Sequence, residues 1–187
     1  MLAEASHGNL QHFLDAQNDA IHFSLRVKWF RQAIESIAYT HSRGVVLGDL
    51  RPDNFLVHAT GSTSLDLWLS DFGGSTCEEL DLNGGGLPGA GFADPSAPRA
   101  ATTATNIFSL GSVLYTILKG HWPHLDPGGS FNSTEEMDEY KTRVGRLFEQ
   151  GMFPDVKGLF GGEIILGCWT KRFSRLSEIL EMAPSEW

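Results

Sequence analysis

The sequence predicts a mainly α-helical domain that carries one small β-hairpin. Two long stretches, 21–41 and 105–118, repeat apolar residues at the spacing of a helix. Two short apolar runs, 55–57 and 65–69, stand on either side of a turn-rich segment, which is the pattern of a hairpin. Helical stretches dominate and strand-like stretches are few, so we expect a fold of the mainly α class.

Composition and charge narrow the class of protein. The chain has 187 residues, of which 41% are hydrophobic and 20% charged, as in an ordinary globular domain. Its formal net charge of −9 argues against nucleic acid or an anionic membrane as a general partner, because both would be repelled. Cys77 and Cys168 form neither a disulfide framework nor a metal-binding pattern. No apolar run has the length of a membrane span and no secretory pattern opens the chain, so we expect a cytoplasmic or nuclear protein.

The first half of the chain alternates helices with short strands. A short amphipathic helix is expected after Asn9, and the long helix over 21–41 should end at Gly44. Residues 45–47 are apolar and predict a short buried strand, and the hairpin follows them.

The second half is predicted to be helical after one loose segment. Residues 81–104 are rich in glycine and proline, and the run from Gly84 to Gly89 formally satisfies a phosphate-binding pattern. No strand precedes that run and no helix follows it, so we expect a flexible loop instead. The helix over 105–118 is apolar on nearly all sides and belongs at the centre of the domain. A helix capped by Ser133 and two shorter ones, 163–169 and 174–182, should complete the fold.

Three oxygen-bearing side chains are the candidate functional residues of the sequence. Asp49 lies five residues before Asn54, and Asp71 follows the second strand of the predicted hairpin. Since Asn54 opens one strand and Asp71 closes the other, strand pairing would bring them together. Phosphoryl transfer needs a carboxylate to orient the attacking hydroxyl and oxygen ligands for Mg²⁺. Taken alone, the segment 49–54 could equally be a polar turn whose residues serve turn chemistry.

The run from Gly48 to Asn54, followed by Asp71-Phe-Gly73, resembles the catalytic loop and the D-F-G motif of serine/threonine-type protein kinases. The whole chain, 1–187, is similar to the C-terminal lobe of that fold. The resemblance makes 1–7 hinge-like, 44–57 the catalytic loop and 71–99 the activation segment.

The resemblance also implies roles for single residues and for two cofactors. Asp49 would orient the substrate hydroxyl, and Arg51 would stand beside the transferred phosphate of ATP. Asn54 and Asp71 would bind Mg²⁺, and Gly73 would belong with them to the nucleotide-binding set.

Several positions depart from the family pattern. Leu47-Gly48 replaces His-Arg, so no arginine is expected to bind a phosphorylated activation segment. Residues 97–99 end in Arg99 where the pattern has a glutamate, so Asp94 or another acid would have to pair with a late arginine such as Arg172. Asn106 replaces an aspartate that anchors the catalytic loop, and its amide can still form hydrogen bonds.

The leading functional hypothesis is a phosphotransferase that moves the γ-phosphate of ATP to a protein serine or threonine. No lysine strand or glycine-rich cover precedes Met1, so we expect the isolated chain to bind ATP weakly and to be inactive or nearly so. The alternatives are a pseudokinase-like protein-binding module and a fragment of a longer kinase. The expected partners are a protein substrate and a protein that covers the exposed cleft, and neither nucleic acid nor membrane is expected.

Overall fold

The structure, a computed structural model, describes residues 4–61, 64–86, 88–97 and 99–183. Its helices are α1 (Leu10–Gln17), α2 (Phe23–Ser42), α3 (Thr103–Lys119), α4 (Thr134–Glu149), α5 (Gly162–Trp169) and α6 (Leu176–Met182), with short 3₁₀ turns η1 (Asn18–Ala20), η2 (Pro52–Asn54) and η3 (Glu78–Leu80). Its strands are β1 (Val45–Val46), β2 (Phe55–Ala59), β3 (Leu65–Leu69), β4 (Thr76–Cys77) and β5 (Leu82–Asn83).

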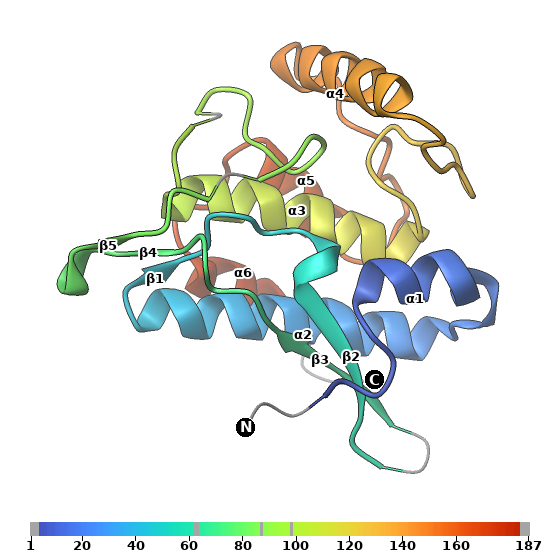
Figure 1. Cartoon of the computed structure of the whole chain (residues 1–187), viewed down its shortest axis with the longest axis horizontal. Coiled ribbons are helices and arrows are strands. Elements are labelled where there is room, and N and C mark those ends of the chain that lie inside the picture. The colour runs from blue at the N-terminus through green and yellow to red at the C-terminus, as the bar shows by residue number, and fades with distance from the viewer. Residues whose placement is uncertain (1–3, 62–63, 87, 98, 184–187) are drawn as a thin grey trace.

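The core is formed by helices packed side by side. α2 and α3 lie against each other, α5 packs on α3, and α6 packs on α2 (Figure 1). Every residue from Thr105 to Ile117 is buried, which confirms that α3 is the central helix. A side chain at Gly111 would begin 2.8 Å from the Cβ of Cys168, so glycine lets α5 approach α3 closely.

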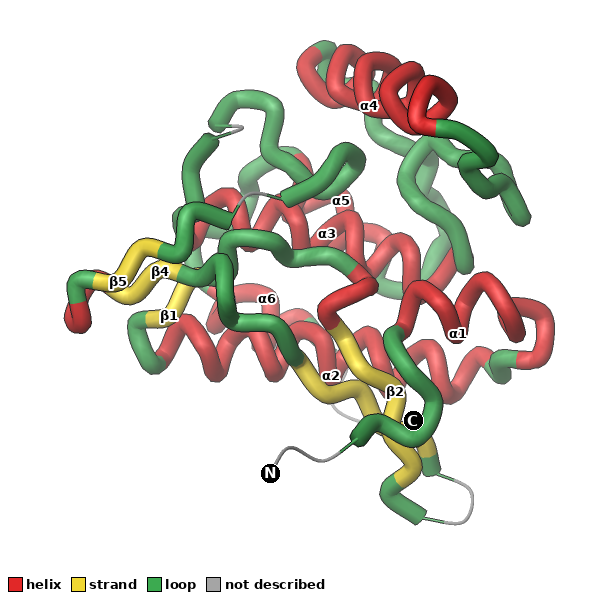
Figure 2. The backbone as a smooth tube through the Cα atoms, in the orientation of Figure 1, coloured by secondary structure: helices red, strands yellow, loops and turns green. Residues whose placement is uncertain are grey.

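The predicted hairpin is confirmed. β2 pairs with β3 in antiparallel register, with Phe55 opposite Leu69 and Ala59 opposite Leu65 (Figure 2). The indole nitrogen of Trp29 on α2 donates a hydrogen bond of 3.2 Å to the carbonyl oxygen of Leu65. The long helix therefore fixes the hairpin whose ends carry the candidate site.

A second small sheet was only partly predicted. β1 was expected, and the structure pairs it with β4 and pairs β4 with β5, all antiparallel. Strands of two residues show no period in the sequence, so nothing marked β4 or β5 beforehand. Figure 1 shows this sheet at one end of the molecule, beyond the end of α2.

Other expectations can be compared directly with the structure. Ser133 caps α4 as predicted, its side chain accepting a hydrogen bond from the Glu136 amide at 3.2 Å. In the segment predicted to be hinge-like, the amide of His7 donates to the carbonyl of Val57 at 3.1 Å, while residues 1–3 lie outside the described part of the chain. Among the described residues, the helices are too short or too polar to cross a lipid bilayer.

Candidate functional site

The hairpin places Asn54 beside the residue that precedes Asp71. Beyond the last strand pair, the amide of Ser70 donates to the carbonyl of Asn54 at 2.8 Å, and the Ser70 hydroxyl donates to the same oxygen at 3.0 Å. Residues distant in sequence are thereby joined by backbone contact at the end of the ladder. This juxtaposition is the one that the hairpin predicted.

Asn54 also holds the segment 49–54 in shape. Its side chain is buried, and the amide nitrogen donates to the carbonyl oxygen of Asp49 at 2.7 Å. Since the nitrogen is used in this way, the amide oxygen is the atom that could bind a cation. Asn54 therefore connects Asp49 on one side with the start of β2 on the other.

Charged neighbours surround the carboxylate of Asp49. The Arg51 Nε lies 3.2 Å from Oδ2 of Asp49 and 3.7 Å from Oδ2 of Asp53. Burial raises the pKa of Asp49 above its ordinary value, and the charges of Asp53 and Asp71 raise it further. Arg51 and a hydrogen bond from the backbone of Gly89 lower this pKa in part. Oδ1 of Asp49 is buried and has no hydrogen-bond partner among the described residues.

Asp71 occupies a backbone conformation that few residues other than glycine adopt. Its φ is +55°, in the left-handed region, where aspartate and asparagine are tolerated best. The amide of Gly73 donates to Oδ1 of Asp71 at 3.3 Å, which orients the carboxylate. The side chain of Phe72, between them, is 48% exposed. Strained residues cluster at functional sites, so this outlier supports a role for Asp71.

A buried amide anchors the segment before Asp49 to the central helix. The side chain of Asn106 on α3 accepts a hydrogen bond from the amide of Leu47 at 2.9 Å and donates to the carbonyl of Leu47 at 2.7 Å. A carboxylate could only accept, so the amide satisfies both backbone groups where an aspartate would satisfy one. The ring of His41 lies 3.1 Å from the same amide oxygen, and burial lowers the pKa of His41.

Glycines pack against the backbone at Gly48 in place of side chains. Residues 82–86, which we call the glycine strap, fold back along 73–75, with hydrogen bonds from Gly84 N to Ser75 O at 2.9 Å and from Gly86 N to Gly74 O at 3.2 Å. A Cβ on Gly48 would lie 2.1 Å from the carbonyl oxygen of Gly74 and 2.7 Å from that of Gly86. The strap thus fills the space beside the position where the family pattern has an arginine. Gly84 and Gly86 thus form backbone hydrogen bonds, a contact that the loop prediction did not foresee.

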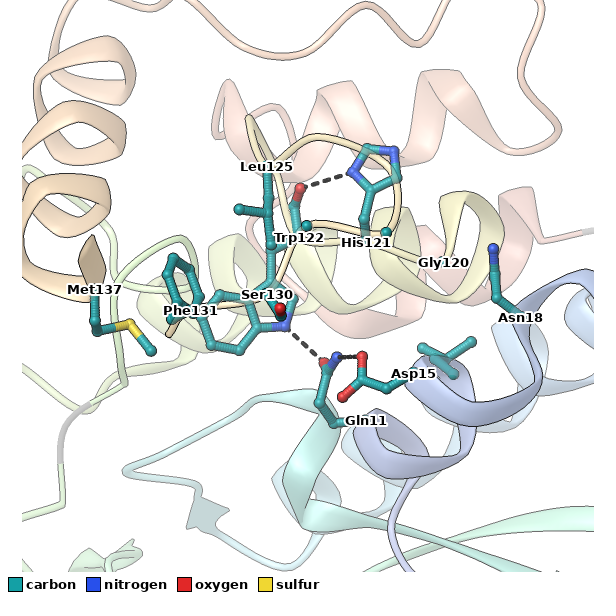
Figure 3. A pocket seen from close by; sticks show the side chains of 13 residues that line it. Gln11, Asp15, Asn18, Gly120, His121, Trp122, Leu125, Ser130, Phe131 and Met137 are labelled. Carbon is teal, nitrogen blue, oxygen red and sulfur yellow. Dashed lines mark hydrogen bonds between the residues drawn. The ribbon is translucent and has the colours of Figure 1, made fainter. Parts of the chain in front are cut away.

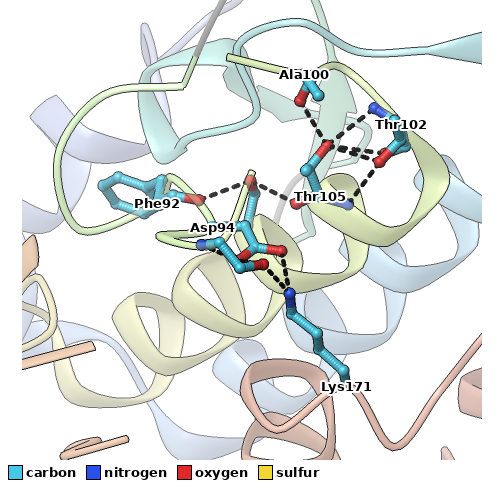
Figure 4. A network of polar contacts seen from close by, with 8 residues as sticks. Phe92, Asp94, Ala100, Thr102, Thr105 and Lys171 are labelled. Atoms are coloured by element: carbon cyan, nitrogen blue, oxygen red, sulfur yellow. Dashed lines mark hydrogen bonds and ion pairs between the residues drawn. The ribbon is translucent and has the colours of Figure 1, made fainter. Parts of the chain in front are cut away.

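An ion pair with one buried partner holds the end of this segment on the helices. Asp94 is almost fully buried, and its Oδ2 lies 2.8 Å from the Lys171 Nζ, just beyond α5 (Figure 4). The amide and hydroxyl of Ser96 both donate to the other carboxylate oxygen, at 2.9 Å. Asp94 therefore provides the acid that Arg99 cannot.

The cation that pairs with Asp94 is Lys171 instead of the expected Arg172. The guanidinium of Arg172 lies over the ring of Phe173, 4.9 Å from its centroid. Arg99 stands where the family pattern has a glutamate, and its side chain is exposed. Pro98, just before it, lies outside the described residues.

The donor set at the site suits a hard cation that keeps part of its water. In the described chain, no cluster of three or more His, Cys, Asp or Glu side chains could hold a metal alone. Mg²⁺ bound with a nucleotide needs one or two protein oxygens, the phosphates and water. The amide oxygen of Asn54 and the carboxylate of Asp71 are such donors. The roles of Asp49, Arg51, Asn54, Asp71 and Gly73 in binding or catalysis stay predictions.

Sequence reasoning missed two contributors to this site. The backbone of Gly89 lowers the pKa of Asp49, and the ring of His41 reaches Asn106 from the far end of α2. A backbone donor leaves no trace in residue type, and an isolated histidine is more often a packing residue. The single available signal was the density of glycines between 84 and 91.

Comparison with known proteins gives one family. The family model for the protein kinase domain matches residues 1–155. The chain is 33% identical over 98 residues to a calcium/calmodulin-dependent protein kinase type 1 from Macrobrachium nipponense, covering 51% of this chain and 28% of that protein. It is 36% identical over 104 residues to CBL-interacting protein kinase 24 from Oryza sativa subsp. japonica, covering 51% and 21%. With the serine/threonine-protein kinase CHK1 of Mycosarcoma maydis it shares 30% identity over 148 residues, covering 75% and 20%.

The chain thus spans between a fifth and roughly a quarter of the length of these three relatives. The family model, in contrast, covers most of the chain itself, and it includes the hairpin, the catalytic-loop residues and the glycine strap. The chain belongs to the protein kinase family.

Proposed function

We propose that the chain carries the catalytic loop and the metal-binding residues of an ATP-dependent protein serine/threonine phosphotransferase. The observation that carries this proposal is the double role of Asn54, which donates to the Asp49 carbonyl and accepts from Ser70 beside Asp71. Asn54 thereby links Asp49, through its side-chain amide, with the residue before Asp71, through its main-chain carbonyl. Serine/threonine kinases among the relatives support the same reaction class.

Each residue has a chemical task in this proposal. The carboxylate of Asp49 accepts the proton of the substrate hydroxyl, and its raised pKa makes it a stronger base than an ordinary aspartate. Arg51, held between Asp49 and Asp53, adds positive charge where a phosphate would approach. When bound, MgATP supplies the phosphoryl group and neutralises its charge. Asn54 and Asp71 supply the protein oxygens for the metal.

The proposal is tested first by nucleotide binding. Melting of the full chain is followed with ATP alone and with ATP plus Mg²⁺, because only the metal-dependent part reports the predicted site. A ligand at one hundred times its Kd stabilises a protein by about 2.7 kcal/mol, which is several degrees in Tm for a domain of this size. Asp71→Asn should remove the Mg²⁺-dependent part of the shift.

Asp81→Asn is the matched control for that variant. Asp81 also has a left-handed φ, +51°, is exposed, and lies in the same segment of the chain. An equal Mg²⁺-dependent shift in wild type and Asp71→Asn would show that Asp71 does not bind the metal. Transfer of radiolabelled phosphate from ATP to a serine protein, lost in Asp49→Asn, then tests the reaction itself.

A protein-binding module is the second candidate, and one observation favours it. The carboxylate of Asp49 is already paired with Arg51, and the glycine strap lies beside the loop. A module of this kind would show no stabilisation by nucleotide with or without Mg²⁺, while still binding a protein partner. The melting experiment therefore separates the two candidates.

A further inference from the structure

Ser6 attaches the chain before α1 to the hairpin. Its hydroxyl accepts a hydrogen bond from the amide of Ala59 at 2.8 Å, and its own amide donates to Nδ1 of His58 at 3.3 Å. The two residues after Ser6 continue this attachment through backbone hydrogen bonds of 3.1 and 2.9 Å with Val57. Residues 6–8, which we call the edge segment, therefore lie along the edge of β2 that does not pair with β3 (Figure 1).

The hydrogen bond between Ser6 and His58 requires one protonation state of the ring. A backbone N–H can only donate, so Nδ1 of His58 is the acceptor and carries no proton in this arrangement. A protonated imidazole has a proton on both nitrogens, and the amide of Ser6 would then face a second donor. Protonation of His58 is therefore incompatible with this contact.

His7 makes a different kind of contact with the same serine. Its Nδ1 lies 2.8 Å from the hydroxyl oxygen of Ser6, and a hydroxyl can both donate and accept. If the ring of His7 is protonated, Nδ1 can donate to this oxygen, because the amide of Ala59 uses only one of its two lone pairs. Both histidines contact Ser6, but only His58 loses its contact on protonation.

Trp68 holds the ring of His58 in either protonation state. The two rings are stacked, with centroids 4.0 Å apart and planes inclined by 28°. A cation is attracted to the face of an indole, so protonation of the imidazole strengthens the stack. The neutral ring thus gains the hydrogen bond from Ser6, and the charged ring gains attraction to Trp68. His58 therefore has two favourable arrangements that differ by one proton.

Asp66 keeps its charge while His58 titrates. Asp66 stands directly opposite His58 in the hairpin, and hydrogen bonds from Lys28 on α2 and from Thr60 lower the pKa of Asp66 to about 2. One carboxylate oxygen of Asp66 contacts Lys28 and Gln32, and the other accepts from Thr60. Asp66 therefore stays ionised between about pH 5 and pH 8, the range in which histidine ordinarily changes its charge.

The titratable groups of α1 and of the chain before it are exposed. α1 contacts β2 and carries His12 and Asp15. The carboxylate of Asp15 accepts a hydrogen bond from Gln11 at 2.7 Å, at a cavity between α1 and the loop that follows α3 (Figure 3). Glu4 precedes the edge segment and is exposed as well. The described contacts of Ser6 with titratable side chains are thus those with the two histidines.

We propose that His58 and Ser6 form a proton-sensitive clip, which attaches the edge segment to the hairpin at neutral pH and releases it when the ring of His58 is protonated. The clip is complete above the pH range in which imidazole titrates and is lost as the pH falls through that range, because only the neutral ring can accept from Ser6. Asn54 precedes the other end of β2. The clip therefore controls the attachment of the chain before α1, and it is separate from the candidate site.

Nuclear magnetic resonance of the nitrogen-15-labelled full chain tests the clip. The ring nitrogens report the tautomer, and Nδ1 of His58 should be the unprotonated nitrogen at about pH 7.5. Hydrogen exchange at the amide of Ala59, expressed as protection relative to an unstructured peptide at the same pH, reports the attachment of Ser6. This protection should fall about two- to tenfold between about pH 7.5 and pH 5.5, the loss expected for one hydrogen bond. The amide of Leu67, which bonds to Gln32, is the internal reference and should keep its protection.

Three variants separate the clip from a general effect of acid. His58→Asn places an amide near the position of Nδ1 and cannot be protonated, so the protection at Ala59 should be the same at both pH values. His7→Asn and His12→Asn each remove another exposed histidine, and both should keep the wild-type fall. A melting curve of each variant verifies that it is folded.

The remaining outcomes would overturn the clip. A proton on Nδ1 of His58 at neutral pH, or equal protection of Ala59 at both pH values in the wild type, would show that the contact does not depend on protonation. An undiminished fall in His58→Asn would mean that another group titrates, and loss of the fall in His7→Asn alone would make His7 that group. An equal fall at Leu67 would mean that acid loosens the whole hairpin.

Discussion

In the helical core the contacts are made by side chains, whereas in the glycine strap they are made by backbone. α3 buries Ile107, Leu110 and Val113 against its neighbours, and each is an apolar residue at helical spacing. The strap instead packs Gly84 and Gly86 on Gly73 and Gly74 at distances that no Cβ would allow. The first kind of contact is visible in a sequence as a pattern of large residues. The backbone contacts of the strap are visible in a sequence only as a lack of large residues.

The two regions should therefore respond to opposite kinds of substitution. A core fails when a large side chain is removed, because a cavity is left. The strap should fail when a methyl group is added, because backbone atoms cannot move aside. The variants below test this difference.

Trp29→Ala should have the largest effect on stability. Trp29 is fully buried, packs edge-on against Phe13 at 5.6 Å and donates to the carbonyl of Leu65. We expect a loss of about 3–5 kcal/mol in the free energy of unfolding, measured by urea denaturation. Tyr39→Ala on the same helix removes a ring that is 61% exposed and should cost under about 1 kcal/mol. Similar losses in the two variants would contradict the assigned core.

Lys171→Met tests the ion pair between Asp94, which follows the strap in the chain, and Lys171, which follows α5. The change leaves Asp94 buried and without its cation, although the two bonds from Ser96 remain. We expect a loss of about 1.5–3 kcal/mol, less than for a pair with both partners buried, because Lys171 is itself half-exposed.

Lys157→Met serves as the control for Lys171→Met. Lys157 is exposed, and the substitution removes the same charge from the surface. It should change the free energy of unfolding by under about 0.5 kcal/mol. If the two variants are equally stable, the Asp94–Lys171 pair contributes nothing measurable.

Gly86→Ala is expected to cost about 1–3 kcal/mol, through overpacking alone. A Cβ on Gly86 would lie 2.7 Å from the Cα of Gly74. Hydrogen exchange should accelerate at the amides of Gly84 and Gly86, which bond to the carbonyls of Ser75 and Gly74. Exchange in α3 should stay slow, because the strap can open without the core.

The control for this variant is Gly145→Ala. Gly145 lies within α4, and a Cβ there would meet nothing within 4 Å. Alanine should stabilise the helix by about 0.5–1 kcal/mol, the reverse of the effect at Gly86. A stabilising effect at both positions would show that the strap is not closely packed.

This contrast explains how much of the fold and of the candidate site could be predicted from the sequence. The long helices, the hairpin and the Ser133 cap follow from side-chain spacing and capping chemistry, and the structure confirms them. The hairpin also brought Asn54 and the end of β3 together, because antiparallel pairing joins residues at its two ends.

The rest could not be predicted because it depends on backbone atoms and distant partners. β4 and β5 are two residues long, too short to show a period. Asp94 and Lys171 pair across 77 positions of the chain, and several acids and cations could have met there equally well. Gly89 acts on Asp49 through an amide that every residue except proline possesses. Such contacts need the fold first.

Asp49→Asn should have the smallest effect on stability, and the sign of that effect is informative. Burial is the main cause that raises the pKa of Asp49, so the folded chain holds the proton more tightly than the unfolded chain. The carboxylate therefore costs stability once it is ionised. This cost is absent below the ordinary aspartate pKa of about 3.9, grows as the pH rises from there through the folded pKa, and is complete above it.

An asparagine at position 49 removes that cost and keeps a similar shape. Relative to wild type, the variant should become more stable as the pH rises through this window, with a constant difference at neutral pH. Urea denaturation of both proteins at a series of pH values measures this difference. Phosphoryl transfer, if the proposed function holds, should be lost in the same variant. A variant that is less stable at neutral pH would mean that the ion pair with Arg51 outweighs burial. Asp49 would then be held ionised chiefly by that pair, and its proposed role as a strengthened base would lose its support.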